Sequence, residues 1–307
     1  MEFPEKDSLY EEYQEHNDFD FSEEYEEQDR ILLLEASEIG DYSQVLEISF
    51  QKLIETIFTN CSYFDLRNEH GDNCLILASR NGHVQIVSFL MSLKNVKIDA
   101  INNIGSNALI EAAENNHLAV VRLLLIDGRI DPNHIDQDGF CCLLTAAGHG
   151  YSEIVKELLK DHRTSPNVFN SNYDTSLHYA CSNGHLETVK ILYYSRKSTI
   201  YLNARNNENY TPLLEAVRNG HTKIVEFLLY CPEINLQGDC YIHYACVYGY
   251  IEIVKILCKI RETPLNLFNK NMNGRTLLIE TLFSGHYGHY DVFNFLIKNS
   301  RVYKIES

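Results

Sequence analysis

A short sequence motif recurs along most of this 307-residue chain at a nearly constant interval. The copy at 211–221, for example, reads Thr-Pro-Leu-Leu-Glu-Ala-Val-Arg-Asn-Gly-His. Six copies begin 34, 34, 34, 36 and 29 residues apart, at residues 73, 107, 141, 175, 211 and 240, and degenerate copies begin at 31 and 276. Self-similarity with a period of about 20–50 residues is typical of repeat architectures. The chain is therefore expected to be a stack of small units rather than one globular core.

A second apolar pattern follows each motif and predicts a second helix. Residues 86–90 and 120–124 place apolar side chains at the i, i+3, i+4 spacing of an amphipathic helix. The motif itself carries a pair of small residues, such as Ala112 with Ala113, which allows neighbouring helices to approach closely. Each unit is thus predicted to be a short helix, a glycine turn and a longer amphipathic helix.

These copies resemble the ankyrin repeat, whose motif is Thr-Pro-Leu-His-x-Ala followed by Gly-His. The stretch Thr211-Pro212-Leu213 keeps the first triplet, and His178 and His243 keep the histidine of the motif. The resemblance covers about residues 31–300 and implies an all-α solenoid of helix-turn-helix units with short β-hairpin finger loops. The expected repeats are 31–67, 68–101, 102–135, 136–169, 170–205, 206–235, 236–270 and 271–307, which together form one domain from 31 to 307.

Local sequence signals refine this picture. A side-chain oxygen at the first motif residue can cap the first helix, and suitable residues are Asn73, Asn107, Thr175, Thr211 and Thr276. Cys141 and Cys240 are poor caps, so their helices are expected to fray more. An apolar stripe over 46–58 suggests a long outer helix at one end, the short interval before Cys240 suggests a truncated finger, and 284–289 suggests a lengthened turn.

The charge of the chain is divided unevenly. Residues 1–30 hold thirteen acidic and two basic residues, a charge of −11, which leaves −6 of the total −17 for the remainder. With few aliphatic residues, this acidic segment is expected to be disordered. It either solubilises the protein or acts as an acidic-aromatic motif that binds a basic groove or folds back on the stack. Tyr10, Tyr13 and Tyr25 within it are candidate phosphorylation sites.

The composition argues against several classes of protein. The acidic balance does not suit binding to nucleic acid, no apolar run reaches the ~20 residues of a membrane span, and the acidic start does not resemble a signal peptide. Nine cysteines without a CxxC spacing indicate reduced thiols in the cytoplasm, with the nucleus as an alternative. A monomer is expected.

The sequence shows no sign of catalysis, a metal or a cofactor. The histidines at the Gly-His position recur once per repeat, and most cysteines fall on motif positions, so both are expected to be structural. No zinc-ligand spacing and no phosphate-binding glycine loop is present, and the repeats leave no room for an enzyme domain. The protein is therefore expected not to be an enzyme and to bind neither a metal nor a cofactor.

Recognition of a protein partner remains as the expected function. The variable positions of the first helices and the fingers should line a concave face. We expect a tyrosine-rich strip in repeats five to eight, made of Tyr173, Tyr179, Tyr210, Arg218, Tyr244, Tyr248 and Phe283. We also expect an acidic patch nearer the middle, made of Glu111, Glu114, Asp136 and Asp138. The first hypothesis is an adaptor or scaffold that binds a protein on this face. The alternative is a stoichiometric inhibitor that masks a basic surface of an enzyme or nucleic-acid-binding protein.

Overall fold

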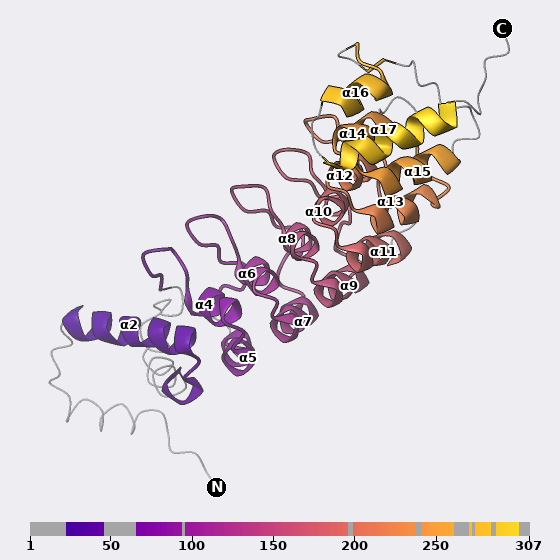
Figure 1. The fold of residues 1–307 in the computed structure, drawn as a ribbon. Coiled ribbons are helices and arrows are strands. Elements are labelled where there is room, and N and C mark those ends of the chain that lie inside the picture. The colour runs from indigo at the N-terminus through magenta and orange to yellow at the C-terminus, as the bar shows by residue number, and fades with distance from the viewer. Residues whose placement is uncertain are drawn as a thin grey trace, which may run out of the picture.

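The protein is an elongated stack of antiparallel helix pairs, with the described finger loops projecting to the same side (Figure 1). The computed structural model describes residues 23–45, 66–93, 96–195, 199–236, 241–260, 270–271, 274–283 and 287–300. The inner layer consists of the first helix of each pair, namely α4 (Cys74–Arg80), α6 (Ala108–Glu114), α8 (Cys142–His149), α10 (Ser176–Ser182), α12 (Pro212–Arg218), α14 (Tyr241–Val247) and α16 (Leu277–Phe283). The outer layer consists of α5 (Val84–Ser92), α7 (Leu118–Asp127), α9 (Ser152–Lys160), α11 (Leu186–Ser195), α13 (Thr222–Leu229), α15 (Ile251–Ile260) and α17 (Tyr287–Ser300).

The first described helix differs from the sequence-based expectation. Helix α2 spans Glu23–Ile39, so it begins before the expected start of the repeats at residue 31 and includes part of the acidic segment. Glutamate is a good helix former, and negative charge is favourable near a helix N-terminus, which explains why these residues extend the helix. The remainder of the acidic segment, with Tyr10 and Tyr13, and the apolar stripe over 46–58 lie outside the described residues.

The predicted helix caps are present. Asn73 accepts a hydrogen bond from the Ile76 amide at 2.9 Å, and Asn107, Thr175, Thr211 and Thr276 make corresponding bonds. Cys141 has the extended backbone of a cap, but its side chain makes no capping bond. Cys240 lies outside the described residues, as does most of the short segment before it.

The recurring histidines hold adjacent repeats together. The His117 ring nitrogen Nε2 lies 2.9 Å from the carbonyl oxygen of Arg80 in the preceding repeat, and His185 reaches Gly148 at 3.0 Å in the same way. The glycine at the same turn of the preceding repeat has a positive φ, for example 75° at Gly150, and a Cβ there would clash with the His185 ring. The prediction of structural histidines is confirmed for these positions.

The core is a continuous apolar layer between the two rows of helices. The small motif residues Ala112, Ala113, Ala146 and Ala147 are fully buried, as their predicted role in close helix packing requires. The described cysteines other than Cys258 are buried as well. Burial raises the pKa of the Cys74 thiol to about 12, which keeps it protonated and unreactive at neutral pH.

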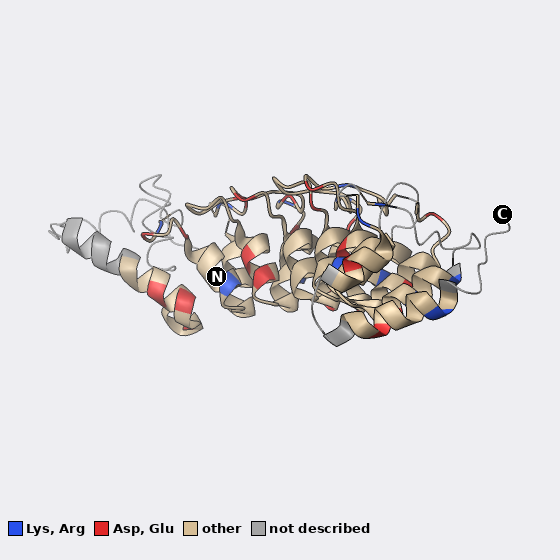
Figure 2. Cartoon of the chain, turned by 45° about the horizontal axis from the view of Figure 1, so that its top comes forward, with Lys and Arg blue, Asp and Glu red and all other residues tan. Residues whose placement is uncertain are grey.

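The described fingers are turns that are each built around one asparagine or aspartate side chain. In the third repeat, Asn102 Oδ1 accepts hydrogen bonds from the amides of Ile104 and Ser106, and the turn closes in a bridge between Ile101 and Asn107. Neighbouring fingers are joined edge to edge, since the Asn103 amide donates to the His70 carbonyl. The expected hairpin-like fingers are therefore present, and they form a row above the inner helices (Figure 2).

Candidate interaction face

Four of the predicted residues form one cluster at the inner helices of repeats six and seven: Arg218 and Tyr244 lie in α12 and α14, Tyr210 precedes α12, and Tyr248 follows α14 and interacts with Arg218. We name this set, Tyr210, Arg218, Tyr244 and Tyr248, the tyrosine-arginine cluster. The Arg218 guanidinium carbon lies 4.2 Å from the centre of the Tyr210 ring, and the Tyr244 ring meets Tyr210 edge-on at 6.0 Å. Tyr248 is 43% exposed. The cluster thus offers ordered aromatic surface with a cation at its centre.

The electrostatics of this cluster favour a neutral Tyr244 and a positively charged Arg218. Burial, together with the neighbouring Tyr210 hydroxyl, raises the pKa of Tyr244 to about 12. Arg218 is paired with Glu215 at 3.4 Å and with the exposed Glu208 at 3.8 Å. These pairs and the Tyr210 ring fix the plane of the guanidinium, so its orientation is set before any partner arrives.

The remaining predicted aromatic residues are placed differently. Tyr173 is 54% exposed and stacks on Phe169 of its own finger at 4.9 Å, whereas the Tyr179 ring packs against Phe140 of the preceding finger at 5.4 Å. No ring contact joins either of them to the tyrosine-arginine cluster within the described residues. The side chain of Phe283 lies outside the described residues, although the residue ends α16.

The acidic patch is only partly a surface feature. Glu114 and Asp138 are exposed, and Asp136 is half-buried because its carboxylate accepts the amides of Asp138 and Phe140 in the finger turn. Glu111 does not match the expectation of an exposed acid, since only 3% of it is accessible. A buried carboxylate needs partners, and Glu111 has two, Arg80 and Asn102.

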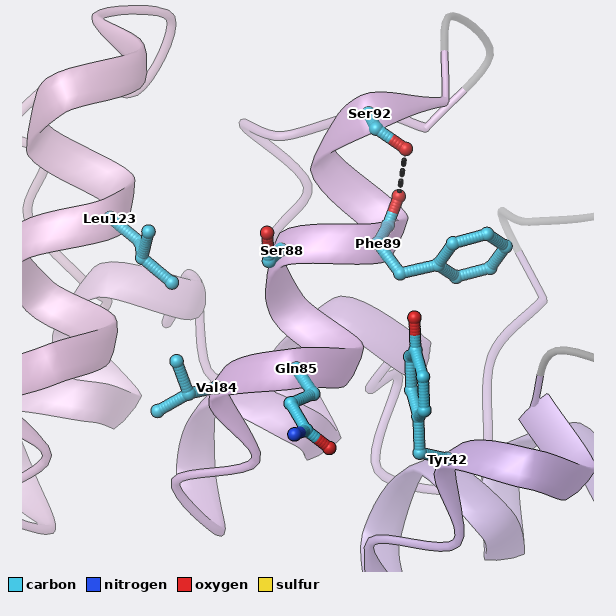
Figure 3. A pocket seen from close by; sticks show the side chains of 7 residues that line it. All are labelled: Tyr42, Val84, Gln85, Ser88, Phe89, Ser92 and Leu123. Carbon is cyan, nitrogen blue, oxygen red and sulfur yellow. Dashed lines mark hydrogen bonds between the residues drawn. The ribbon is translucent and has the colours of Figure 1, made fainter.

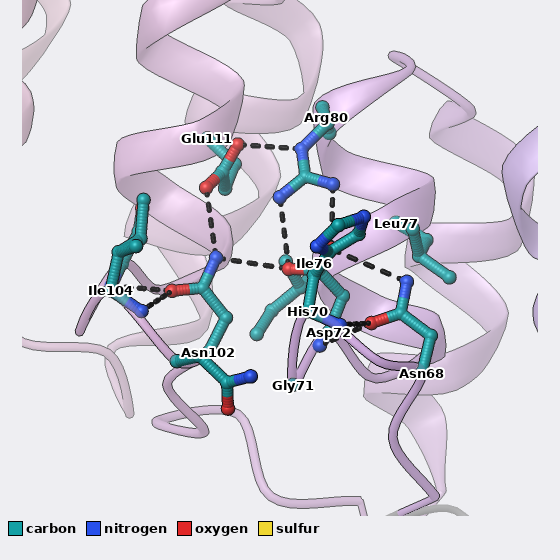
Figure 4. Close-up of polar contacts among 12 residues, drawn as sticks. Asn68, His70, Gly71, Asp72, Ile76, Leu77, Arg80, Asn102, Ile104 and Glu111 are labelled. Atoms are coloured by element: carbon teal, nitrogen blue, oxygen red, sulfur yellow. Dashed lines mark hydrogen bonds and ion pairs between the residues drawn. The ribbon is translucent and has the colours of Figure 1, made fainter.

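Figure 4 shows the network that buries Glu111. Arg80 donates from Nε to Glu111 at 2.8 Å and from both terminal nitrogens to Asp72, which is fully buried. Asn102 donates to Asp72 at 2.9 Å and to Glu111 at 3.2 Å. The guanidinium and the asparagine outweigh the burial of Asp72, so that the pKa of Asp72 falls below its usual range.

A repeated pairing in this face escaped the sequence analysis. The finger asparagine donates to the residue nine positions later, from Asn102 to Glu111, and the same spacing recurs elsewhere. The other pairs are Asn170 with Tyr179, Asn206 with Glu215, and Asn271 with Glu280. The pairing left a signal in the sequence, because Asn102, Asn206 and Asn271 are each followed nine positions later by a glutamate, whereas Asp136 is followed by Thr145.

The described ranges also include a surface feature that lies apart from the predicted site residues. A depression of the surface at the outer helices is lined by Tyr42, Val84, Gln85, Ser88, Phe89, Ser92 and Leu123 (Figure 3). It contains no charged side chain and none of the predicted site residues. Within those ranges, no group of three His, Cys, Asp or Glu residues is arranged to hold a metal ion, and no helix is both long and apolar enough to cross a membrane.

Comparison with known proteins agrees with the geometry. A family model of ankyrin repeats (three copies) matches residues 36–136, 125–206, 143–238 and 197–266. A search of curated proteins finds no match. Paired helices, the histidine contacts between repeats and the finger turns agree with this match, and the chain belongs to the ankyrin-repeat family, whose repeats are generally protein-interaction modules and typically non-enzymatic.

Proposed function

We propose that this protein is a non-enzymatic adaptor that binds a protein partner on the concave face of repeats five to eight. The single observation that carries the proposal is the tyrosine-arginine cluster. Interfaces concentrate their binding energy in tyrosine, tryptophan and arginine side chains that are already ordered. Here Tyr210 and Arg218 hold each other in place, so little side-chain entropy is lost when a partner covers them.

The surroundings of the cluster support a protein rather than a small ligand. Tyr173 and Phe169 are each about half exposed on the finger of the fifth repeat, and Tyr248 is exposed on the inner side of the seventh. Aromatic surface is thus spread over several successive repeats, as an extended protein interface requires.

A second function, masking of a basic protein surface, is favoured by the exposed carboxylates Glu114 and Asp138 on the same row of fingers and inner helices. Acidic and basic residues are interspersed along the stack as a whole (Figure 2), so such masking would depend on local acidic groups. Binding dominated by exposed charges weakens steeply with salt, whereas binding dominated by buried aromatic contacts does not.

The proposal is tested by site-specific photocross-linking in cell extract. A benzoylphenylalanine replaces Tyr248 in one variant and Tyr230, an exposed tyrosine next to the outer helix α13, in the control. We expect a discrete cross-linked protein from position 248 and not from position 230. Tyr244→Ala combined with Tyr248→Ala should abolish binding of the identified partner without changing the circular dichroism spectrum.

Equal cross-linking from both positions, or retained binding by the double variant, contradicts the proposal. The same partner, measured at low and high salt, separates the two functions. A loss of affinity of about a hundredfold or more favours masking of a basic surface, because that steepness requires several neutralised charges.

A further inference from the structure

Two junctions between repeats are built from residues at the same motif positions. Between repeats two and three these are Asp72, Asn102 and Glu111, and between repeats five and six they are Asp174, Asn206 and Glu215. The hydrogen bonds correspond as well. Asn206 donates to Asp174 at 2.8 Å and to Glu215 at 3.4 Å, as Asn102 does to Asp72 and Glu111.

The junctions differ in the residue that carries the positive charge. At the first junction, Arg80 of α4 bridges both carboxylates. The residue at the same position of α10 is Ser182, whose hydroxyl instead accepts a hydrogen bond from Asn219 at 3.2 Å. A serine side chain ends one atom beyond Cβ, so the guanidinium that occupies the first junction has no counterpart on α10 at the second.

No other cation of the described chain takes over this role completely. Arg218 pairs with one oxygen of Glu215 at 3.4 Å and turns toward Glu208 and the Tyr210 ring. Asp174 makes no ion pair within the described residues, and its carboxylate accepts a hydrogen bond from the Asn206 side chain. Burial raises the pKa of Glu215. Arg218 lowers it and the negative charge of Asp174 raises it, and the net shift is upward.

We propose that Asp174 and Glu215 bind the guanidinium group of an arginine side chain from a protein partner, in the position that Arg80 occupies at the first junction. The first junction shows that this acceptor set, two carboxylates joined by an asparagine, holds a guanidinium with good geometry. Guanidinium suits the site better than ammonium, because its planar donors can serve two carboxylates at once. The site lies beside the tyrosine-arginine cluster, and the inference rests on the proposed function in that a protein partner supplies the arginine.

The test uses the full chain and short peptides as probes. Acetyl-Gly-Ser-Xaa-Ser-Gly-amide is prepared with arginine, lysine or citrulline at Xaa; citrulline keeps the shape of arginine without its charge. Binding is followed by carboxyl carbon resonances of labelled Asp and Glu side chains. We expect the arginine peptide to shift the Asp174 and Glu215 signals and to bind about tenfold more tightly than either of the others, as a lost charge-assisted pair implies.

Matched variants identify the site. Asp174→Asn should weaken arginine binding about tenfold, whereas Glu226→Gln, at an exposed carboxylate of the outer helix α13, should leave it unchanged. Ser182→Arg should fill the site from within the chain, lower the pKa of Glu215 and abolish peptide binding. A chain that folds but binds citrulline or lysine as tightly as arginine overturns the inference, as does equal loss in the Asp174 and Glu226 variants. Cross-linking at position 248 without arginine binding overturns this inference alone and leaves the adaptor proposal standing.

Discussion

The residues that precede the inner helices α8 and α10 share a backbone conformation but differ in whether the side chain can cap the helix. Cys141 has φ −114° and ψ 166°, close to the −91° and 168° of Thr175, yet only threonine supplies an oxygen for the free amides of the first turn. The cysteine therefore leaves α8 with the geometry of a cap and without its hydrogen bond.

Cys141→Thr should raise the free energy of unfolding by about 1 kcal/mol, because the new hydroxyl can accept a hydrogen bond from an amide of the first turn of α8. The measurement is urea unfolding followed by circular dichroism. Cys141→Val is the matched control, since valine has the shape of threonine without its oxygen. If threonine is no more stabilising than valine, capping is not what limits this helix.

At the scale of single residues, the sequence predicts the interactions that depend on one motif position and misses those that depend on distant neighbours. The caps and the structural role of the histidines at the Gly-His position each depend on one motif position, and both were predicted from the sequence. The burial of Glu111 was not, because its partners Arg80 and Asn102 belong to a preceding helix and to a finger. A carboxylate on a short inner helix gives no sign by itself of which neighbours will cover it.

At the scale of whole elements, each described finger depends on one side chain, which in some fingers serves two purposes. Asn102 accepts two amides of its own turn, while its NH2 group donates to Asp72 and Glu111. Asp136 fills the first role alone, and no carboxylate stands nine residues later. Asn102 thus joins its finger to the helices beneath it, whereas Asp136 supports only its own turn.

Asn102→Asp should destabilise the protein by about 2–4 kcal/mol, because it keeps the turn acceptor but replaces a buried donor with a third carboxylate beside Asp72 and Glu111. Asp136→Asn is the reverse exchange at a finger without that demand, and it should change stability by less than about 1 kcal/mol. Both are measured by urea unfolding. Similar effects at the two fingers would contradict the dual role assigned to Asn102.

For the molecule as a whole, a stack of repeats has no single centre of stability. Each repeat contacts its neighbours, so the junctions set local stability one by one. The period of the motif made the succession of helix pairs predictable from sequence. The difference in charge between the junctions at Asp72 and at Glu215 was not predictable. It arises because Arg80 reaches both carboxylates of its junction, and the sequence alone does not show that this position and its equivalent, Ser182, lie next to those carboxylates.

The two junctions should respond to acid in opposite directions. The pKa of Asp72 is lowered in the folded chain, so its contribution is complete above the ordinary aspartate pKa of about 4 and is lost as the pH falls through the lower folded value. The pKa of Glu215 is raised, so the folded chain takes up this proton more readily than the unfolded chain does. Its junction therefore gains stability as the pH falls from neutral toward the ordinary glutamate pKa of about 4.3.

Hydrogen exchange with mass spectrometry, corrected for the intrinsic pH dependence of exchange, can resolve α4 and α6 from α10 and α12. Between pH 7 and about 4.5, protection should rise at α10 and α12 and stay level at α4 and α6; below about pH 4 it should fall at α4 and α6. Glu215→Gln should remove the rise at α10 and α12 and leave the other junction unaffected, because glutamine is neutral throughout. A uniform response along the stack would mean that the junctions unfold as one unit and that local charge does not set their stability.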